Sequence, residues 1–191
     1  MSASSDQSAN RSINTSRAVA AVIGVVLVGL LWVLLSASPK SSVNADSPLL
    51  GQPAPALETT RLDGAKFNLA QRKGSWVVLN FFNSTCVPCQ NEHPLLVAFA
   101  AEQESSTDAV ELYTVVNDDN DGSVNAYFAI NGGDWPRLRD ANGAIAVSFG
   151  VAKVPETWII DPNGFVRVRI AGELSEGLLQ EQMAALKEMT K

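Results

Sequence analysis

Cysteine and histidine are scarce in this 191-residue chain, which contains two cysteines, Cys86 and Cys89, and one histidine, His93. A structural zinc site needs about four ligands, and these three side chains alone cannot supply them. A disulfide that only stabilises a fold usually closes a long loop, whereas a bond between Cys86 and Cys89 would enclose two residues. The scarcity therefore disfavours both a zinc site and a purely structural disulfide, and it favours a redox-active pair.

Basic residues are also in the minority, with 14 Lys and Arg against 20 Asp and Glu, so that the net charge is −6 at pH 7. Domains that bind nucleic acid are usually basic because they must neutralise phosphate groups. The acidic balance therefore argues against nucleic acid as a partner. It is compatible with a soluble surface that faces other proteins.

The two cysteines lie between a segment typical of a strand and a segment typical of a helix. Residues 76–82 are largely apolar, β-branched or aromatic, and residues 90–103 have the character of a helix. Cys86 and Cys89 would then occupy the first helical turn, where unpaired N–H groups and the positive end of the dipole favour a thiolate. Because a thiolate is the nucleophile in thiol–disulfide exchange, the arrangement predicts a thiol–disulfide oxidoreductase with a Cys-x-x-Cys redox centre.

An apolar run near the N-terminus predicts export. Residues 18–35 carry no charge, and as a helix they would be roughly 27 Å long, close to the hydrocarbon thickness of a bilayer. Arg11 and Arg17 precede this run, which favours a cytoplasmic tail over residues 1–17 and an exported remainder. We expect one transmembrane helix that anchors the protein in the cell membrane. A cleaved signal peptide is the alternative, although its apolar region is usually shorter.

The rest of the chain divides into a linker and one domain. Residues 36–48 are rich in serine and contain prolines, which predicts an extended linker, and residues 49–191 have the length of one compact domain. The Asp-Gly pair at residues 63–64 indicates an N-terminal hairpin. Strand and helix patterns then alternate, with a helix-and-loop region over residues 123–140, and the domain closes with a hairpin and a helix. This order predicts an α/β fold with a mixed central sheet flanked by helices.

Glu92 and His93 are further candidates near the cysteines. Glu92 follows Cys89 by three residues, about one helical turn, so its carboxylate can lie on a similar face and accept or relay a thiol proton. A solvated surface glutamate is the alternative. His93 and the two cysteines could instead bind copper, which would make the protein a copper-binding chaperone. No histidine follows His93 in the sequence, and this counts against that function.

Several motifs resemble those of membrane-anchored, thioredoxin-like proteins of cytochrome c maturation. The resemblance covers about residues 52–172. The motifs include Gly51-Gln52-Pro53-Ala54-Pro55, Val78-Leu79-Asn80-Phe81-Phe82, Cys86-Val87-Pro88-Cys89-Gln90-Asn91-Glu92-His93-Pro94 and Val154-Pro155-Glu156-Thr157-Trp158-Ile159-Ile160-Asp161. On these motifs the chain is similar to the group that includes ResA, TlpA and CcmG/DsbE. The Cys-x-x-Cys-x-x-Glu-His-Pro run and the Gly-Val-x-x-x-Pro-Glu-Thr run are most similar to the CcmG/DsbE branch.

The resemblance implies a thioredoxin-like fold and a role for individual residues. It implies that Cys86 is the exposed nucleophile and that Cys89 is the resolving thiol. It implies that Pro155 is a cis proline in a loop that lies against the cysteines. Glu92 and Glu156 would then be the carboxylates that line the redox groove. The redox-active disulfide would serve without any bound cofactor or metal.

The resemblance also implies a direction of electron flow and two partners. Such proteins reduce the disulfide of the haem-binding cysteines of apocytochrome c, and a transmembrane thiol carrier of the CcdA/DsbD type recharges them. Val87 and Pro88 supply no cation that would stabilise a Cys86 thiolate, as a strong oxidant requires, and this favours a reductant. A general oxidase or isomerase for secreted proteins is the alternative. Thr85 stands where tryptophan is usual, so we expect a different substrate-facing surface.

Overall fold

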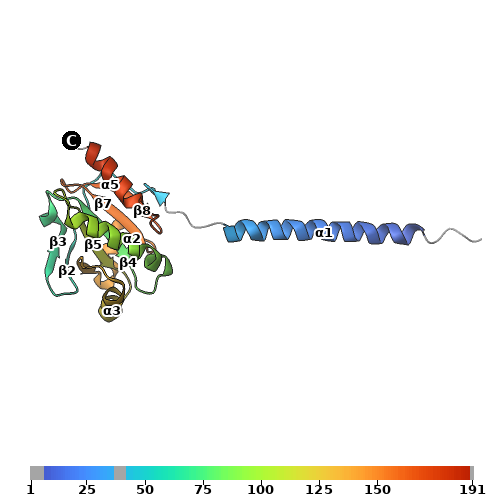
Figure 1. Ribbon diagram of the computed structural model, residues 1–191, viewed down its shortest axis with the longest axis horizontal. Helices are drawn as coiled ribbons and strands as arrows, with labels where there is room; N and C mark the ends of the chain where they lie inside the picture. The colour runs from blue at the N-terminus through green and yellow to red at the C-terminus, as the bar shows by residue number, and fades with distance from the viewer. Residues whose placement is uncertain (1–6, 37–41, 190–191) are drawn as a thin grey trace, which may run out of the picture. The chain divides into compact units, whose positions relative to one another are not determined.

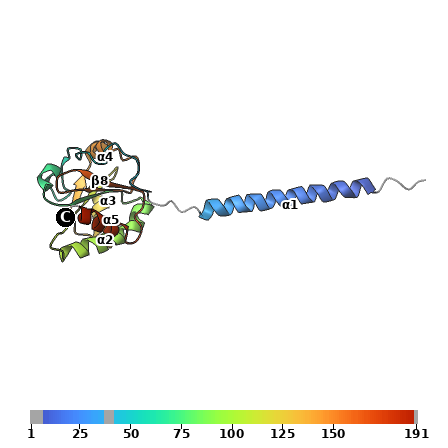
Figure 2. The ribbon, with the colours of Figure 1, turned by 90° about the horizontal axis from the view of Figure 1, so that it is seen from above.

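The computed structural model describes residues 7–36 and 42–189. It consists of two units, residues 1–39 and 40–191, which are described separately here. Figures 1 and 2 show the ribbon of both units from two directions. The chemistry of interest lies in the second unit, which contains both cysteines.

The first unit contains one helix, α1 (Gln7–Ser36). Within the described residues, no helix combines the length and the apolar character that crossing a membrane requires. The anchor at residues 18–35 therefore stays a prediction. The boundaries of the tail, 1–17, and of the linker, 36–48, also stay predictions, and both segments lie partly outside the described residues.

The second unit is built around a six-stranded sheet with the strand order β1-β8-β7-β4-β5-β6. Its strands are β1 (Ser42–Val43), β4 (Val77–Phe82), β5 (Glu111–Val116), β6 (Arg137–Arg139), β7 (Glu156–Ile160) and β8 (Val166–Ala171). The central strand β4 is parallel to β5 and antiparallel to β7, so the predicted mixed sheet is confirmed. Every residue of β4 is buried, as expected for a strand whose two faces are both covered.

Helices and a small hairpin complete the unit. They are the hairpin strands β2 (Glu58–Thr60) and β3 (Lys66–Asn68), the 3-10 turns η1 (Leu69–Arg72) and η2 (Ala141–Gly143), and the helices α2 (Val87–Glu104), α3 (Asp121–Asn131), α4 (Ala144–Phe149) and α5 (Leu178–Met189). Strands β2 and β3 pair antiparallel on either side of the Asp-Gly turn, as the sequence predicts. Helices α2 and α5 cover one face of the sheet and α4 covers the other (Figure 2).

Two hydrophobic clusters on opposite faces of the sheet form the core. Along β4, Val78 and Phe82 belong to the cluster under α2, α3 and α5, whereas Leu79 and Phe81 belong to the cluster under α4. This alternation follows from the two-residue period of a strand. Asn80 has the same parity as Val78 and Phe82, so its side chain points to the face that α2 covers. The central strand therefore places one polar side chain under the helix that carries the cysteines.

Candidate active site

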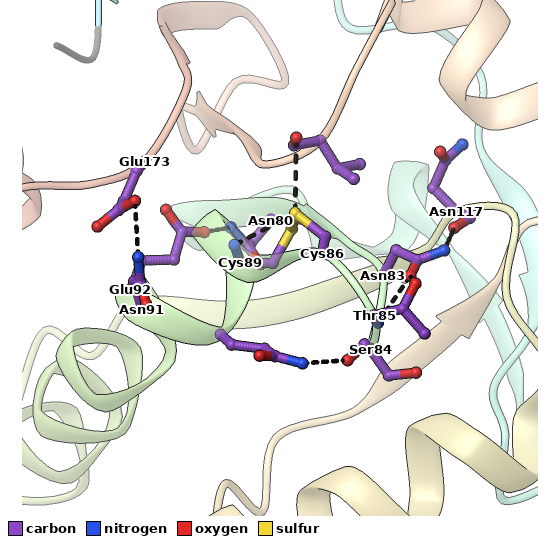
Figure 3. The surroundings of a disulfide bond; sticks show 12 residues. Asn80, Asn83, Ser84, Thr85, Cys86, Cys89, Asn91, Glu92, Asn117 and Glu173 are labelled. Atoms are coloured by element: carbon purple, nitrogen blue, oxygen red, sulfur yellow. Dashed lines mark hydrogen bonds between the residues drawn. A yellow bond between two sulfur atoms is a disulfide. The ribbon is translucent and has the colours of Figure 1, made fainter. Parts of the chain in front are cut away.

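The two cysteines lie where the central strand passes into α2. Cys86 is the N-cap residue of this helix, and its Sγ accepts a hydrogen bond from the Cys89 N–H at 3.2 Å. The two cysteines form a disulfide with their Cα atoms 5.2 Å apart (Figure 3). Cys86 is half-buried, whereas Cys89 is completely buried. Of the two cysteines, only Cys86 is therefore partly exposed to solvent.

The loop before β7 lies against the accessible cysteine. The Val154–Pro155 peptide bond is cis, and Cys86 Sγ lies 3.7 Å from the Val154 carbonyl oxygen. Proline has no N–H group, so the main chain offers no donor to the sulfur at position 155. The structure thus brings Val154 and Pro155 beside the redox pair, although they are far from it in sequence.

Glu92 is a completely buried carboxyl one helical turn after Cys89. Its Oε1 accepts a hydrogen bond from Asn80 Nδ2 at 2.7 Å, and its Oε2 accepts one from the Leu174 N–H at 2.7 Å. Burial raises the pKa of Glu92 from 4.5 to about 7, and the two hydrogen bonds oppose this rise. A carboxyl with a pKa near neutrality can both accept and release a proton at pH 7. The solvated-surface alternative for Glu92 is wrong.

Glu156 is also buried, but its side chain is engaged elsewhere. Its two carboxylate oxygens accept hydrogen bonds from Arg169 Nε and Nη2 at 2.9 and 3.0 Å. Side chains alternate along a strand, and the next residue, Thr157, is the one that faces α2 and the Asn80 amide. Glu156 therefore points to the opposite face of the sheet. The structure does not bring its carboxylate together with Glu92, and a role for Glu156 at the redox pair stays a prediction.

His93 is packed in an aromatic cluster. Its ring lies within 6.1 Å, between centroids, of four aromatic rings, those of Phe82, Tyr127, Phe128 and Trp135. Its Nε2 donates a hydrogen bond to the Gly132 carbonyl oxygen at 2.9 Å, and burial lowers the pKa of this histidine. These contacts describe a residue that packs α2 against α3. Among residues 7–36 and 42–189, no group of three or more His, Cys, Asp or Glu side chains is arranged to hold a metal ion.

Sequence reasoning missed the hydrogen bonds that Asn83, three residues before Cys86, makes with the loop after β5. Asn83 Nδ2 donates to the carbonyl oxygens of Asn117 and Asp118 at 3.1 and 2.8 Å, and its Oδ1 accepts from the Thr85 N–H at 2.8 Å. The main chain of Asn83 accepts a further bond from the Cys86 N–H at 3.2 Å. An asparagine directly after a buried strand is a known turn signal. Its partners in the loop after β5, however, are distant in sequence.

Two more side chains bind the main chain of Ser84, in the same segment before Cys86. Asp119 Oδ2 accepts a hydrogen bond from the Ser84 N–H at 2.6 Å, and Gln90 Nε2 donates to the Ser84 carbonyl oxygen at 2.7 Å. Thr85 is exposed, and its hydroxyl donates to Asn83 Oδ1 at 2.7 Å. Figure 3 shows Asn83, Ser84 and Thr85 on one side of the disulfide and Glu92 on the other. The polar segment that precedes Cys86 is therefore held by several hydrogen bonds.

Comparisons with known proteins agree with this geometry. A family model described as the AhpC/TSA family matches residues 50–169. The chain is 31% identical over 166 residues to the thiol:disulfide interchange protein HelX from Rhodobacter capsulatus, with 85% of this chain and 91% of that protein covered. It is 28% identical over 168 residues to the thiol:disulfide interchange protein DsbE from Pseudomonas aeruginosa, with 86% of each covered. The solved structure of MTB dsbF in its mixed oxidized and reduced forms matches with a TM-score of 0.62 at 27% identity, covering 68% of this chain and 94% of that chain.

Proposed function

Because the chain belongs to the AhpC/TSA family and is a thiol–disulfide oxidoreductase with a thioredoxin-like fold, we propose that it reduces disulfides in exported proteins. The observation that carries the proposal is the difference in burial between its two cysteines. Cys86 is half-buried at the N-terminus of α2, and Cys89 is completely buried. Such an asymmetry supports one cysteine that meets the substrate and one that resolves the mixed disulfide.

In the proposed reaction, the reduced protein passes two electrons to its substrate. The Cys86 thiolate attacks one sulfur of the substrate disulfide, and the other substrate sulfur leaves as a thiolate that takes up a proton. Cys89 then gives its proton to the Glu92 carboxylate and attacks Cys86 Sγ. This attack breaks the mixed disulfide and releases the second substrate sulfur as a thiolate, which is protonated in turn. The Cys86–Cys89 disulfide is the product, and the reaction needs no bound cofactor.

The surroundings of Cys86 support this sequence of steps. Unpaired N–H groups at the start of α2 and the helix dipole stabilise a thiolate at the N-cap position. The main chain at Val154, close to Cys86 Sγ, is available to an extended segment of substrate. Val87 and Pro88 carry no positive charge that would stabilise the reduced form strongly, and this favours a reductant over a strong oxidant.

The finer assignment concerns the substrate and the electron donor. We propose that the substrate is apocytochrome c, whose haem-binding cysteines it keeps reduced during cytochrome c maturation. A transmembrane thiol carrier of the CcdA/DsbD type would return electrons to the Cys86–Cys89 pair. Both proposals rest on the similarity of the cysteine and proline motifs to the CcmG/DsbE branch.

We further propose that residues 18–35 tether the protein to the cell membrane, with the N-terminus in the cytoplasm and the domain outside. The uncharged run and the two preceding arginines, Arg11 and Arg17, support this placement. Separation of membranes from soluble fractions tests the tether. Protease added to cells that lack their outer layers but keep an intact cell membrane tests the orientation. A domain that protease cannot reach until the membrane is broken would contradict the proposed orientation.

A trapping experiment tests the function. In a Cys89→Ser variant the resolving thiol is absent, so the mixed disulfide at Cys86 persists and its partner can be isolated. The matched control is Cys86→Ser, which should trap nothing. Recovery of apocytochrome c would support the proposal. Recovery of many unrelated secreted proteins without apocytochrome c would instead indicate a general oxidase or isomerase, and copper bound to the reduced protein would indicate a chaperone.

A further inference from the structure

A row of buried polar side chains crosses the centre of the sheet on the face covered by α2. Asn80 on β4 lies in register between Thr157 on β7 and Thr114 on β5, and none of the three is more than 1% exposed. Asn80 Nδ2 donates one hydrogen bond to Glu92 Oε1 at 2.7 Å and one to Thr157 Oγ1 at 3.1 Å. Both hydrogens of this amide are therefore used, and one of them is given to the candidate proton acceptor.

The other end of the same amide has no partner. Asn80 Oδ1 is buried and accepts no hydrogen bond from the described residues. An unpaired buried acceptor costs free energy, so its position next to a buried carboxyl needs a physical reason. The present orientation suits an ionised Glu92, which can only accept hydrogen bonds. It does not suit a neutral Glu92 that carries its proton on Oε1, because the nitrogen of Asn80 cannot accept a hydrogen bond from a carboxyl O–H.

A half-turn of the amide reverses the pairing with Glu92 and moves Nδ2 to the position where Oδ1 now has no partner. It would place Oδ1 of Asn80 where Nδ2 now lies, and the two lone pairs of Oδ1 could accept from the Glu92 O–H and from the Thr157 hydroxyl. A threonine hydroxyl can donate as well as accept, so both hydrogen bonds would persist with their direction reversed. The Leu174 N–H donates to Glu92 Oε2 in either form. The proton is thereby directed to Oε1, the oxygen that faces Asn80.

We propose that Asn80 is a positioning residue of this oxidoreductase, whose amide turns over when Glu92 gains a proton and keeps the carboxyl hydrogen-bonded in both forms. The inference rests on the proposed function, in which Glu92 takes the proton of Cys89. It explains how a carboxyl that is fully enclosed by protein can gain and lose a proton in every cycle without a rearrangement of the main chain. Thr157 takes part because its hydroxyl accommodates both orientations.

The charged and titratable groups around this carboxyl are few. Glu173, in the segment after β8, is close enough to raise the pKa of Glu92, and Cys89 lies one turn before it on α2. Glu156 points to the opposite face of the sheet, where Arg169 holds it. With a pKa of about 7, both forms of Glu92 are populated near neutrality. The turnover of the amide would thus occur near neutral pH.

Nuclear magnetic resonance of the full-length oxidised protein in detergent tests the turnover directly. The side-chain amide of Asn80 is labelled with ¹⁵N and the Glu92 carboxyl with ¹³C, and both are followed through the titration of Glu92. We expect the contacts between the Nδ2 hydrogens of Asn80 and Thr157 to disappear as Glu92 becomes protonated, with one shared midpoint. Contacts that stay unchanged across the titration would overturn the proposal.

Two variants test the consequence for activity. Asn80→Leu removes the amide, and we expect the rate at which the reduced protein reduces an oxidised Cys-x-x-Cys-His peptide at pH 7 to fall on the order of tenfold, the effect of losing one hydrogen bond to a charged group. Because the lost bond lowers the pKa of Glu92, the pH profile should also move to higher pH. The control is Thr114→Val, an equally buried neighbour of Asn80 in the same row, and its pH profile should not move. If Asn80→Leu does not fold, Asn80→Asp replaces it, because aspartate has the shape of asparagine. The carboxyl introduced at position 80 should raise the pKa of Glu92 and so also move the pH profile to higher pH.

The outcomes separate this inference from the proposed function. If the Asn80 variant and Thr114→Val share the pH profile of the unmodified protein while Cys86→Ser abolishes reduction, the positioning role of Asn80 is wrong and the oxidoreductase function stands. If Cys86→Ser still reduces the peptide, the proposed function itself fails. A shifted profile for the Asn80 variant alone supports both.

Discussion

Replacing Glu92 with glutamine should stabilise the protein at neutral and alkaline pH while slowing the reaction it catalyses. Glu92 is completely buried, and burial raises its pKa from 4.5 to about 7. Between these two values the folded state binds a proton that the unfolded state has lost, so the free energy of unfolding falls as the pH rises. The stability from this group is complete below pH 4.5 and is lost as the pH rises through about 7.

The structure also gives the size of this effect. One pKa unit corresponds to about 1.4 kcal/mol, so the shift of Glu92 predicts a loss of about 3 kcal/mol between acidic and alkaline pH. Glutamine cannot ionise and lacks this loss. Once the Asn80 amide turns over, the glutamine amide can donate to Asn80 Oδ1 and its carbonyl can accept from the Leu174 N–H. Glu92→Gln should therefore approach the unmodified protein in stability below pH 4.5 and exceed it above the raised pKa.

Urea unfolding of oxidised Glu92→Gln and of the oxidised unmodified protein, below pH 4.5 and above about pH 7, measures the difference in their free energies of unfolding. Glu156→Gln is the matched control, because Glu156 is also a buried glutamate, lies directly after Pro155 and forms a bidentate pair with Arg169. Breaking that pair leaves a poorly solvated guanidinium, so this variant should be less stable than the unmodified protein at pH 8. An unfolding free energy for Glu92→Gln that follows the same pH dependence as the unmodified protein would refute the reasoning.

Three further predictions concern the residues around the disulfide. In the reduced protein, a thiol-alkylating reagent should modify the half-buried Cys86 well before the buried Cys89, and peptide mass spectrometry shows the order; equal rates would contradict the assigned roles. Asn83→Ala removes three side-chain hydrogen bonds to main-chain groups, so the unfolding free energy should fall by about 2 kcal/mol and amide exchange at Thr85 should accelerate. His93→Ala opens a cavity in the aromatic cluster and should cost about 3 kcal/mol of stability, with thermal unfolding as the measurement and an unchanged melting temperature as the contrary result.

Local patterns were sufficient to predict the parts of the fold that local chemistry determines. The turn at residues 63–64 and the strand at 77–82 both follow from nearby residues. The edge strand β6 (Arg137–Arg139) lies inside residues 123–140, which the sequence predicts as helix and loop. It is three residues long and exists because it pairs with β5. Strand β1 (Ser42–Val43) likewise depends on β8, so no local signal marks either one.

The site also combines features that nearby residues determine with features that depend on residues distant in sequence. The spacing of Cys86 and Cys89 and the position of Glu92 on α2 follow from helix geometry, and the structure places all three as expected. The face on which Glu156 lies depends on the register between β7 and its neighbours, and a shift of one residue reverses the face. The hydrogen bonds of Asn80 join three elements that are distant in sequence. A pattern within one segment cannot reveal them.

The reduction potential of the Cys86–Cys89 pair tests the central claim most directly. Equilibration of the full-length protein with thiol–disulfide buffers of known potential, followed by alkylation of free thiols, gives the value. The account predicts a reducing couple, in the region of thioredoxin at about −270 mV. A potential close to that of a strong periplasmic oxidant, at about −120 mV, would contradict it.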